Sequence, residues 1–470
     1  MLHVTIIGGG IAGLATAFYL QKKSREIGQP IDYTLFERDD RFGGKVITAT
    51  EGNFIIEGGP DSFLTSKPWA VQLCRDVDLA ERLIPTNDDC RNIYVLQDGK
   101  LIPFPSGFRL TVPTEFIPFA MSPLISPLGK LRMGLDFIIP PRSVNGDESV
   151  GSFIRRRLGN EAVDKIAGPM MAGIYSADPE RLSIQSTFPM FVEMEQQHGS
   201  LIKAMRTAHR RQPAPNGTGD KATSMFTSLQ GGMTELVEAL VNCMEGNLRL
   251  GCAVAALRDL SSGFEVILDQ GETLTTDAVV LAIPATLAAT LTEPFDAELA
   301  ALLRQIRYAS TGNVSLGYRR ADVAGHDFDG FGFMVPKSEG RQISACTWTS
   351  TKFHHRAAPD DVLLRVFFGG DGQSHLVDWS DEDLLALARR EVADIMGITA
   401  VPVIHKIFRW RNGNPQYDVG HLERVAAIEA QAAQTLGLYL AGSAFRGIGI
   451  PDCIKSGLTT VEQLLNQFSS

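Results

Sequence analysis

Three glycines directly after a short apolar run constrain the fold of this chain more than any other feature. Residues 3–7 (His-Val-Thr-Ile-Ile) are rich in β-branched side chains, and Gly-Gly-Gly-Ile-Ala-Gly follows at residues 8–13. Apolar residues then recur at helical spacing up to residue 20, and a second apolar run, residues 33–36, ends at Glu37. Strand, glycine turn, helix, strand and acidic residue within about thirty residues predict a dinucleotide-binding unit.

Each residue type in this fingerprint has a physical role. Gly8 permits the tight turn, Gly10 lets a pyrophosphate approach the backbone, and Gly13 lets the helix pack closely on the strand. The helix presents unpaired N–H groups and the positive end of its dipole to the phosphates. Glu37 is expected to accept a hydrogen bond from a ribose 2′-hydroxyl, which argues against a 2′-phosphorylated cofactor. The candidate binding residues here are Gly8, Gly9, Gly10, Ile11, Ala12, Gly13 and Glu37.

Length, charge and cysteine usage limit the class of protein. A chain of 470 residues is long for one core, so we expect two or three lobes. The net charge of −10 argues against nucleic acid as a partner. The six cysteines form no Cys-x-x-Cys pair, which favours a reducing compartment without a disulfide framework or a metal site. With no secretory signal and no apolar run of roughly eighteen residues, we expect a cytoplasmic protein without a transmembrane segment.

The remaining sequence predicts further elements with less detail. Apolar stretches within residues 108–137 favour a buried helical lobe over a segment lying on a membrane, because few basic residues accompany them. Residues 149–158 predict a helix whose arginines, 155–157, lie on a solvated face or complement the helix C-terminus. Residues 210–220 predict a loop. We expect strands at 248–257, 263–268 and 273–282 and within 310–369, a helix at 381–396 capped by Ser380, and a final helix at 455–465.

Several motifs together resemble a known family. Residues 41–45 (Arg-Phe-Gly-Gly-Lys) are followed by Gly-Gly-Pro-Asp-Ser at 58–62, as in the flavin amine oxidase superfamily. Residues 173–175 (Gly-Ile-Tyr), 415–417 (Pro-Gln-Tyr) and 447–453 (Gly-Ile-Gly-Ile-Pro-Asp-Cys) resemble the oxygen-dependent protoporphyrinogen oxidases. The similarity is greatest to the soluble bacterial branch, whose members act as coproporphyrinogen III oxidases, and it runs over nearly the whole chain.

The resemblance implies an α/β fold (α+β overall) in three parts. A Rossmann-like FAD-binding domain would be assembled from discontinuous segments, residues 1–60, 225–293 and 402–470. A substrate-binding domain built on a mixed β-sheet would comprise residues 61–104, 213–224 and 294–401. A small helical lobe would comprise residues 105–212.

The resemblance also implies the chemistry. Non-covalently bound FAD would oxidise a porphyrinogen by six electrons in haem biosynthesis, with O₂ as acceptor and three H₂O₂ as product. No residue is named as catalytic, because flavin N5 would accept the hydride. Lys67 and Ile174 are the candidate substrate-binding residues. Beyond the first glycine loop, the candidate cofactor-binding residues are Arg38, Gly44, Lys45, Gly59, Pro60, Asp61, Ser62, Val254, Trp410, Gly442, Gly449, Ile450 and Pro451.

Other interpretations stay open at this stage. The chain is also compatible with another flavin oxidase, such as an amine oxidase or a carotenoid desaturase. A flavin-less chaperone on the same fold is the alternative from a different class, although such proteins lose the phosphate loop that is present here. The substrate branch, a homodimer, peripheral membrane contact and transfer of product to a ferrochelatase are not decided by the sequence.

Overall fold

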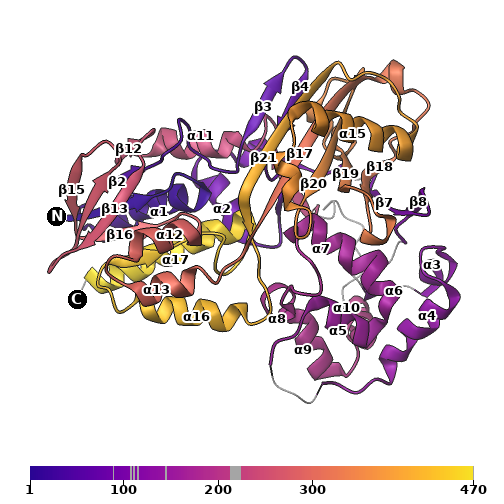
Figure 1. Ribbon diagram of the computed structural model, residues 1–470, viewed down its shortest axis with the longest axis horizontal. Coiled ribbons are helices and arrows are strands. Elements are labelled where there is room, and N and C mark those ends of the chain that lie inside the picture. The colour runs from indigo at the N-terminus through magenta and orange to yellow at the C-terminus, as the bar shows by residue number, and fades with distance from the viewer. Residues whose placement is uncertain are drawn as a thin grey trace.

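Segments from the start, middle and end of the chain assemble into one part of the molecule, which holds both termini (Figure 1). In this computed structural model, residues 1–87, 89–105, 108–109, 112–113, 116–142, 146–211 and 224–468 are described. The loop expected at 210–220 lies outside the described residues except for its first two positions, which end helix α10 (Leu201–Arg211).

A five-stranded parallel sheet forms the centre of that part, in the order β12-β2-β1-β16-β22. Ile7 at the end of β1 lies opposite both Phe36 on β2 and Leu281 on β16, so three strands end at the same edge. The residues at this end of β1, β2 and β16 are almost all buried, which suits a sheet that is covered on both faces. The strands are β1 (Leu2–Ile7), β2 (Ile31–Phe36), β12 (Asn247–Arg249), β16 (Ala278–Leu281) and β22 (Leu438–Leu440).

Two separate apolar cores cover the faces of this sheet. On one face, α1 (Ile11–Ile27) packs against α17 (Ile450–Phe468), α11 (Thr234–Cys243) and α2 (Pro68–Asp76). On the other lie α12 (Ala285–Thr292), α13 (Ala297–Leu303) and α16 (His421–Ala432). Strands β13 (Val254–Asp259), β14 (Phe264–Leu268) and β15 (Thr273–Thr276) form an antiparallel sheet beside the second core. The mixed α/β fold class is thereby confirmed.

Three boundaries differ from those expected. The final helix begins at Ile450, not at residue 455, because Pro451 is tolerated in a first turn where its missing N–H has no partner to lose. The stretch 248–257 is two strands, β12 and β13, separated by Gly251 at φ +63°. The stretch 273–282 is likewise β15 and β16, which belong to different sheets.

A seven-stranded mixed sheet forms the second part, in the order β21-β17-β20-β19-β18-β7-β8. All neighbours are antiparallel except β18 and β7. Residues 404–415, which fall within a range expected for the FAD-binding domain, form edge strand β21 of this sheet. Its strands are β7 (Asn92–Gln97), β8 (Lys100–Pro103), β17 (Tyr308–Arg319), β18 (Gly330–Met334), β19 (Ile343–Trp348), β20 (Asp361–Gly369) and β21 (Ile404–Pro415).

Short elements connect the two sheets. A hairpin of β3 (Thr48–Glu51) and β4 (Phe54–Glu57) follows the Gly43–Gly44 pair. Strands β5 (Phe63–Leu64), β11 (Phe226–Leu229) and β6 (Leu83–Pro85) form a small sheet. Helix α15 (Asp381–Met396) packs on the seven-stranded sheet and begins after Ser380, whose hydroxyl accepts the Asp383 N–H as predicted.

The helical lobe has its own apolar core, and two expectations about it are corrected. Of the three arginines at the end of α5, Arg157 is fully buried rather than solvated, with its Nε 2.6 Å from Asp136. A buried guanidinium requires such a partner, and Asp136 is also fully buried. The apolar segment is only partly buried: Met133 lies in the core, whereas Met121 is 80% exposed.

The lobe contains the short strands β9 (Phe108–Arg109) and β10 (Val112–Pro113) and the 3₁₀ helix η2 (Leu135–Phe137), but most of it consists of other short helices. They are α3 (Phe116–Met121), α4 (Pro127–Gly134), α5 (Val150–Leu158), α6 (Asn160–Ala162), the π-helix η3 (Val163–Ala167), α7 (Gly168–Tyr175), α8 (Ile184–Thr187), α9 (Pro189–His198) and α10.

Candidate functional site

The turn between β1 and α1 has the shape that a phosphate-binding loop requires. Gly8 has φ +108°, and a β-carbon on it would lie 2.5 Å from the Ala282 carbonyl oxygen. A β-carbon on Gly13 would lie 1.9 Å from the Gly8 carbonyl oxygen. Gly10, by contrast, has no atom within 4 Å of its would-be β-carbon, so the space in front of the α1 N-terminus is open. The crowding behind the loop and the space in front of it fit a bound pyrophosphate.

Glu37 lies where β2 ends and reaches back to the same loop. One of its carboxylate oxygens accepts the Gly9 N–H at 2.7 Å, and the other accepts the Asp39 N–H at 2.9 Å. Its backbone carbonyl accepts the Cys252 N–H, which brings the start of β13, with Val254, close to this acid. Each carboxylate oxygen can accept a further hydrogen bond from a ribose hydroxyl.

The second glycine pair packs directly on the first loop. Gly43 donates its N–H to the Gly9 carbonyl at 2.8 Å, and a β-carbon on Gly44 would lie 3.2 Å from the Gly10 Cα. Arg41, which was not among the predicted binding residues, donates from its guanidinium to the Gly44 carbonyl at 2.6 Å and so holds this turn. Its position at the start of Arg-x-Gly-Gly-Lys was the available signal. Arg38 is largely exposed and pairs with Asp39.

A third glycine segment, Gly58–Gly59, joins the two preceding glycine turns to the seven-stranded sheet. A β-carbon on Gly59 would lie 1.8 Å from the Lys45 carbonyl oxygen, so these two backbones touch. The Gly58 carbonyl accepts hydrogen bonds from Trp410 Nε1 at 2.8 Å and from Asn313 Nδ2 at 2.9 Å. Trp410 on β21 therefore contacts this segment, as does Asn313 on β17, which the sequence analysis missed.

Three mostly buried charged residues, Asp61, Lys352 and Arg365, support the same segment. Asp61 accepts hydrogen bonds from Ser62 and from Lys352 Nζ, which lies 2.9 Å away. Burial alone would raise the pKa of Asp61, but the charges of Lys352 and Arg365 hold it well below its usual range. Arg365 also donates to the Gly59 carbonyl at 2.6 Å. Neither cation was predicted, although Arg365 interrupts an apolar strand in a way that signals a buried partner.

The start of α17 brings the end of the chain to these turns. Gly442 follows β22, and its would-be β-carbon lies 3.8 Å from the Ala12 side chain at the start of α1. Gly449 directly precedes Ile450 and Pro451, the first residues of α17. The predicted cofactor-binding positions at both ends of the chain are thus brought together, and α17 presents a second helix N-terminus to the same region.

Lys45 and Lys67 both approach the first turn of α17. Lys67 Nζ lies 2.7 Å from both carboxylate oxygens of Asp452, although its side chain remains 40% exposed. Lys45 donates to the Gly413 carbonyl, and burial lowers its pKa. Cys453 is buried, and burial raises the pKa of its thiol to about 12 although the charge of Lys45 opposes the shift.

Ile174, the other candidate substrate-binding residue, is half exposed on α7. Its neighbour Tyr175 lies near Asp452, and burial together with that carboxylate raises the pKa of Tyr175 to about 12. The C-terminal end of α7 therefore lies near the first turn of α17.

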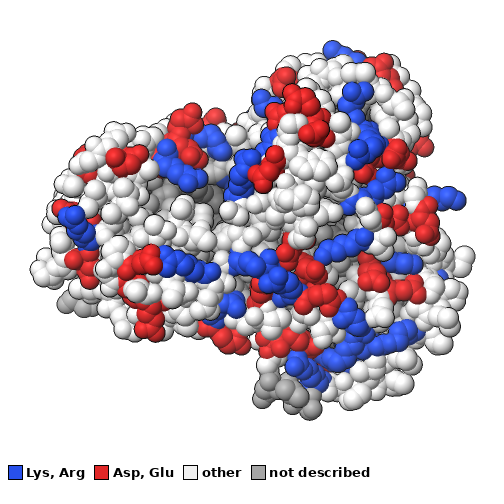
Figure 2. Space-filling model, in the orientation of Figure 1, with Lys and Arg blue, Asp and Glu red and all other residues white. Residues whose placement is uncertain are grey.

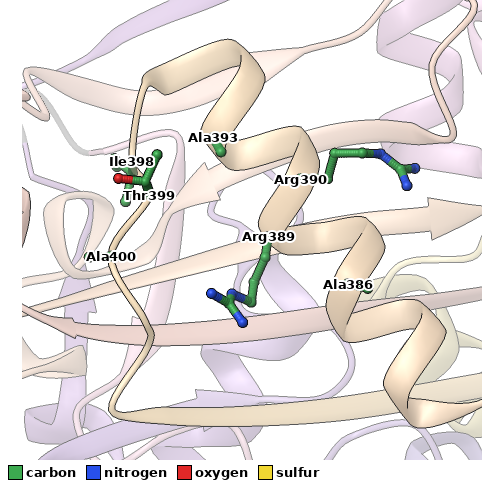
Figure 3. Close-up of a pocket in the computed structure, with 7 residues that line it drawn as sticks. All are labelled: Ala386, Arg389, Arg390, Ala393, Ile398, Thr399 and Ala400. Atoms are coloured by element: carbon green, nitrogen blue, oxygen red, sulfur yellow. The ribbon is translucent and has the colours of Figure 1, made fainter.

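Charge and hollows elsewhere do not compete with this region. Figure 2 shows Lys and Arg interspersed with Asp and Glu over one face of the molecule. A depression of about 350 Å³ lies beside α15, and its lining includes Arg389, Arg390, Ile398, Thr399 and three alanines (Figure 3). No candidate site residue lines it.

The central parallel sheet and the converging glycine turns are typical of α/β flavin oxidoreductases. Residues 11–465 match the model of the flavin-containing amine oxidoreductases, and the chain belongs to that family. No helix in the described part of the chain is both long and apolar enough to cross a membrane.

Individual proteins of this family show which of its members the chain resembles. The chain is 38% identical to the coproporphyrinogen III oxidase of Bacillus subtilis (strain 168) over 480 residues, covering 100% of this chain and 99% of that protein. It is 31% identical to the Staphylococcus aureus protein of the same name, with 98% of each chain covered. A crystal structure from Exiguobacterium sp. 255-15, described as a protoporphyrinogen oxidase, is 32% identical with a TM-score of 0.88, covering 100% and 99%.

Proposed function

We propose that this chain oxidises coproporphyrinogen III to coproporphyrin III with non-covalently bound FAD and O₂. The observation that carries the proposal is full-length identity of 31–38% to three bacterial proteins named coproporphyrinogen III oxidase. The chloroplast protoporphyrinogen oxidase of Arabidopsis thaliana is 27% identical, so protoporphyrinogen IX is the second substrate to test.

The described residues fit a flavin dinucleotide. The open space before Gly10 faces a helix N-terminus, which suits a pyrophosphate, and Gly44 closes on it from the other side. Glu37 retains acceptor capacity for a ribose, which supports a cofactor without a 2′-phosphate. The start of α17, with the positive end of its dipole, suits the redox end of the cofactor.

The protein's own part in the reaction is binding and orientation. A bound flavin would supply two-electron oxidation with reoxidation by O₂, so that one porphyrinogen and three O₂ would give one porphyrin and three H₂O₂. Trp410 and Asn313 hold the Gly58 carbonyl, and Arg365 holds that of Gly59, which keeps this segment in one conformation. Lys67 is proposed to attract a substrate carboxylate, and Ile174 to contact the macrocycle.

The remaining assignments are proposals too. The three-part division of the chain and the candidate site residues are supported by the convergence of the glycine turns. A cytoplasmic location, a homodimer, peripheral membrane contact and transfer of the product to a ferrochelatase stay predictions from the sequence and its resemblance.

The test is an aerobic assay of the flavin-loaded protein with coproporphyrinogen III and, separately, protoporphyrinogen IX, followed by porphyrin fluorescence. We expect a rate well above autoxidation, faster with coproporphyrinogen III, together with three H₂O₂ for each porphyrin. Colourless protein that binds no FAD would contradict every flavin oxidase assignment. No rise above autoxidation with either substrate would contradict the porphyrinogen assignment alone.

A further inference from the structure

The segment from Gln416 to His421 lies where the three parts of the molecule meet. The Tyr417 carbonyl accepts the Ser183 N–H of the helical lobe at 2.7 Å. The Gln416 N–H donates to the Arg307 carbonyl at 2.8 Å, just before β17. The same segment continues into α16, which covers the parallel sheet. It is therefore held by the lobe and by the seven-stranded sheet at once.

The Tyr417 hydroxyl closes the loop that precedes α17. It donates to the Ser443 carbonyl at 2.7 Å and accepts the Gly447 N–H at 2.7 Å. The side chain is buried, and burial raises the pKa of Tyr417 well above its ordinary value, so the hydroxyl keeps the proton that it donates. One hydroxyl thus bridges the two ends of residues 443–447.

His421 holds the middle of the same loop. Its ring stacks on that of Tyr417, with centroids 3.9 Å apart and an angle of 14°, and its Nε2 lies 2.7 Å from the Phe445 carbonyl oxygen. The side chain is fully buried, and burial lowers the pKa of His421 to about 4, so the ring is neutral. Because a carbonyl can only accept, the proton lies on Nε2.

Neither residue lies in the glycine turns, but the loop that they hold lies between two of the predicted cofactor-binding glycines. Gly442, just before the loop, approaches Ala12 of α1, and Gly449, just after it, directly precedes α17. Gly447 has φ +150°, and a β-carbon there would lie 2.4 Å from Asp452 Cβ, so the loop has little freedom to adopt another path. Helix α17 begins just after this loop, and the positive end of its dipole favours negative charge in front of its first turn.

We propose that Tyr417 and His421 are positioning residues that fix the 443–447 loop for the redox end of the flavin and tie that loop to the helical lobe. The inference rests on the flavin binding in the proposed function but not on the porphyrinogen substrate. A loop held in this way stabilises the reduced flavin, which carries more negative charge, more than the oxidised flavin. Loss of the Tyr417 or the His421 contact with the loop should therefore weaken FAD binding and lower the midpoint potential of the bound flavin.

The test is Tyr417→Phe, which keeps the ring and removes the hydroxyl. Two buried backbone groups then lose their partner, and we expect the Kd of FAD to rise about tenfold or more. We also expect a lower midpoint potential and a changed visible circular dichroism of the bound flavin. Tyr439→Phe is the matched control, since that hydroxyl bonds Gln467 at the far end of α17, and its potential should equal that of the unmodified protein.

His421 supplies a second, independent test. His421→Phe keeps a stacked ring without the N–H donor. We expect it to raise the Kd of FAD and to lower the midpoint potential of the bound flavin, as Tyr417→Phe does. His421→Gln restores an N–H donor and should recover most of the potential. A folded Tyr417→Phe or His421→Phe protein with unchanged Kd and potential would overturn the proposal, as would equal effects in Tyr439→Phe. If Tyr417→Phe does not fold, the His421 pair decides. Because the readouts use flavin alone, they are independent of whether any porphyrinogen is oxidised.

Discussion

Gly13 packs so closely on Gly8 that a β-carbon on Gly13 would lie 1.9 Å from the Gly8 carbonyl oxygen. Ala282 Cβ, just after β16, would lie 3.3 Å from the same carbon, so the first turn of α1 lies against the ends of two strands. Since backbone atoms cannot move aside as a flexible side chain can, the clash must displace the loop itself.

We therefore expect Gly13→Ala to abolish flavin binding and to lower the free energy of unfolding by about 2–3 kcal/mol. Flavin absorbance per protein and a denaturant titration measure the two effects. Gly134→Ala is the matched control, because its helical backbone is compatible with alanine and nothing lies within 4 Å of the added carbon. That variant should keep its flavin. Normal flavin content in Gly13→Ala would contradict the role of the close contact.

The local patterns of the first forty residues predicted β1, α1 and β2 and the convergence of Gly8, Gly10 and Gly13, because those features depend on neighbouring residues. The cap at Ser380 was predicted for the same reason. The motif at 447–453 was identified by resemblance, and its proximity to Ala12 required the fold.

Long-range pairs could not be predicted in this way. Arg157 follows two other arginines and looks solvated in sequence, yet helical phase turns it toward Asp136 in the lobe core. Lys352 and Asp61 are 291 residues apart, and only the tertiary fold brings them together. A one-dimensional pattern contains no information on such a pair.

The Asp61–Lys352 pair is the subject of the second prediction. Both side chains are mostly buried, and removing one partner leaves an uncompensated charge. We expect Lys352→Met to cost about 3 kcal/mol of unfolding free energy at pH 7. Lys23→Met is the matched control, because its pair with Glu26 is surface-exposed and should contribute almost nothing. Denaturant titrations compare the two, and equal effects would contradict the prediction.

The same pair predicts a pH dependence. The pKa of Asp61 is lowered in the folded protein, so its contribution is fully present above the unfolded value of about 3.9 and is lost as pH falls toward the folded value. In Lys352→Met, burial is opposed only by the charge of Arg365 and the hydrogen bond from Ser62, so the pKa of Asp61 should rise. We expect the stability difference between the two proteins to shrink as pH falls below about 4. A constant difference between pH 7 and 3 would contradict this assignment.

Lys67 provides a kinetic prediction that rests on the proposed substrate. Its ammonium group pairs with Asp452 at 2.7 Å while the side chain stays 40% exposed, which leaves room for a substrate carboxylate on the same cation. If Lys67 binds substrate and transition state equally, Lys67→Ala should raise KM about tenfold with a smaller fall in kcat. Lys22→Ala removes a similarly exposed partner of Asp76 and should leave KM unchanged. An unchanged KM in Lys67→Ala would restrict Lys67 to holding α17.

Cys453 tests whether the flavin is bound covalently. It lies in the first turn of α17, where a cofactor would come close, but thioether chemistry requires an accessible thiolate. Burial raises the pKa of this thiol to about 12, so less than about one part in ten thousand is ionised at pH 7. We therefore expect acid precipitation to release all of the flavin, leaving a colourless pellet of unmodified mass, and Cys453→Ala to keep its flavin. A polypeptide that retains the flavin mass after denaturation, and loses it in Cys453→Ala, would show instead that this cysteine forms the bond.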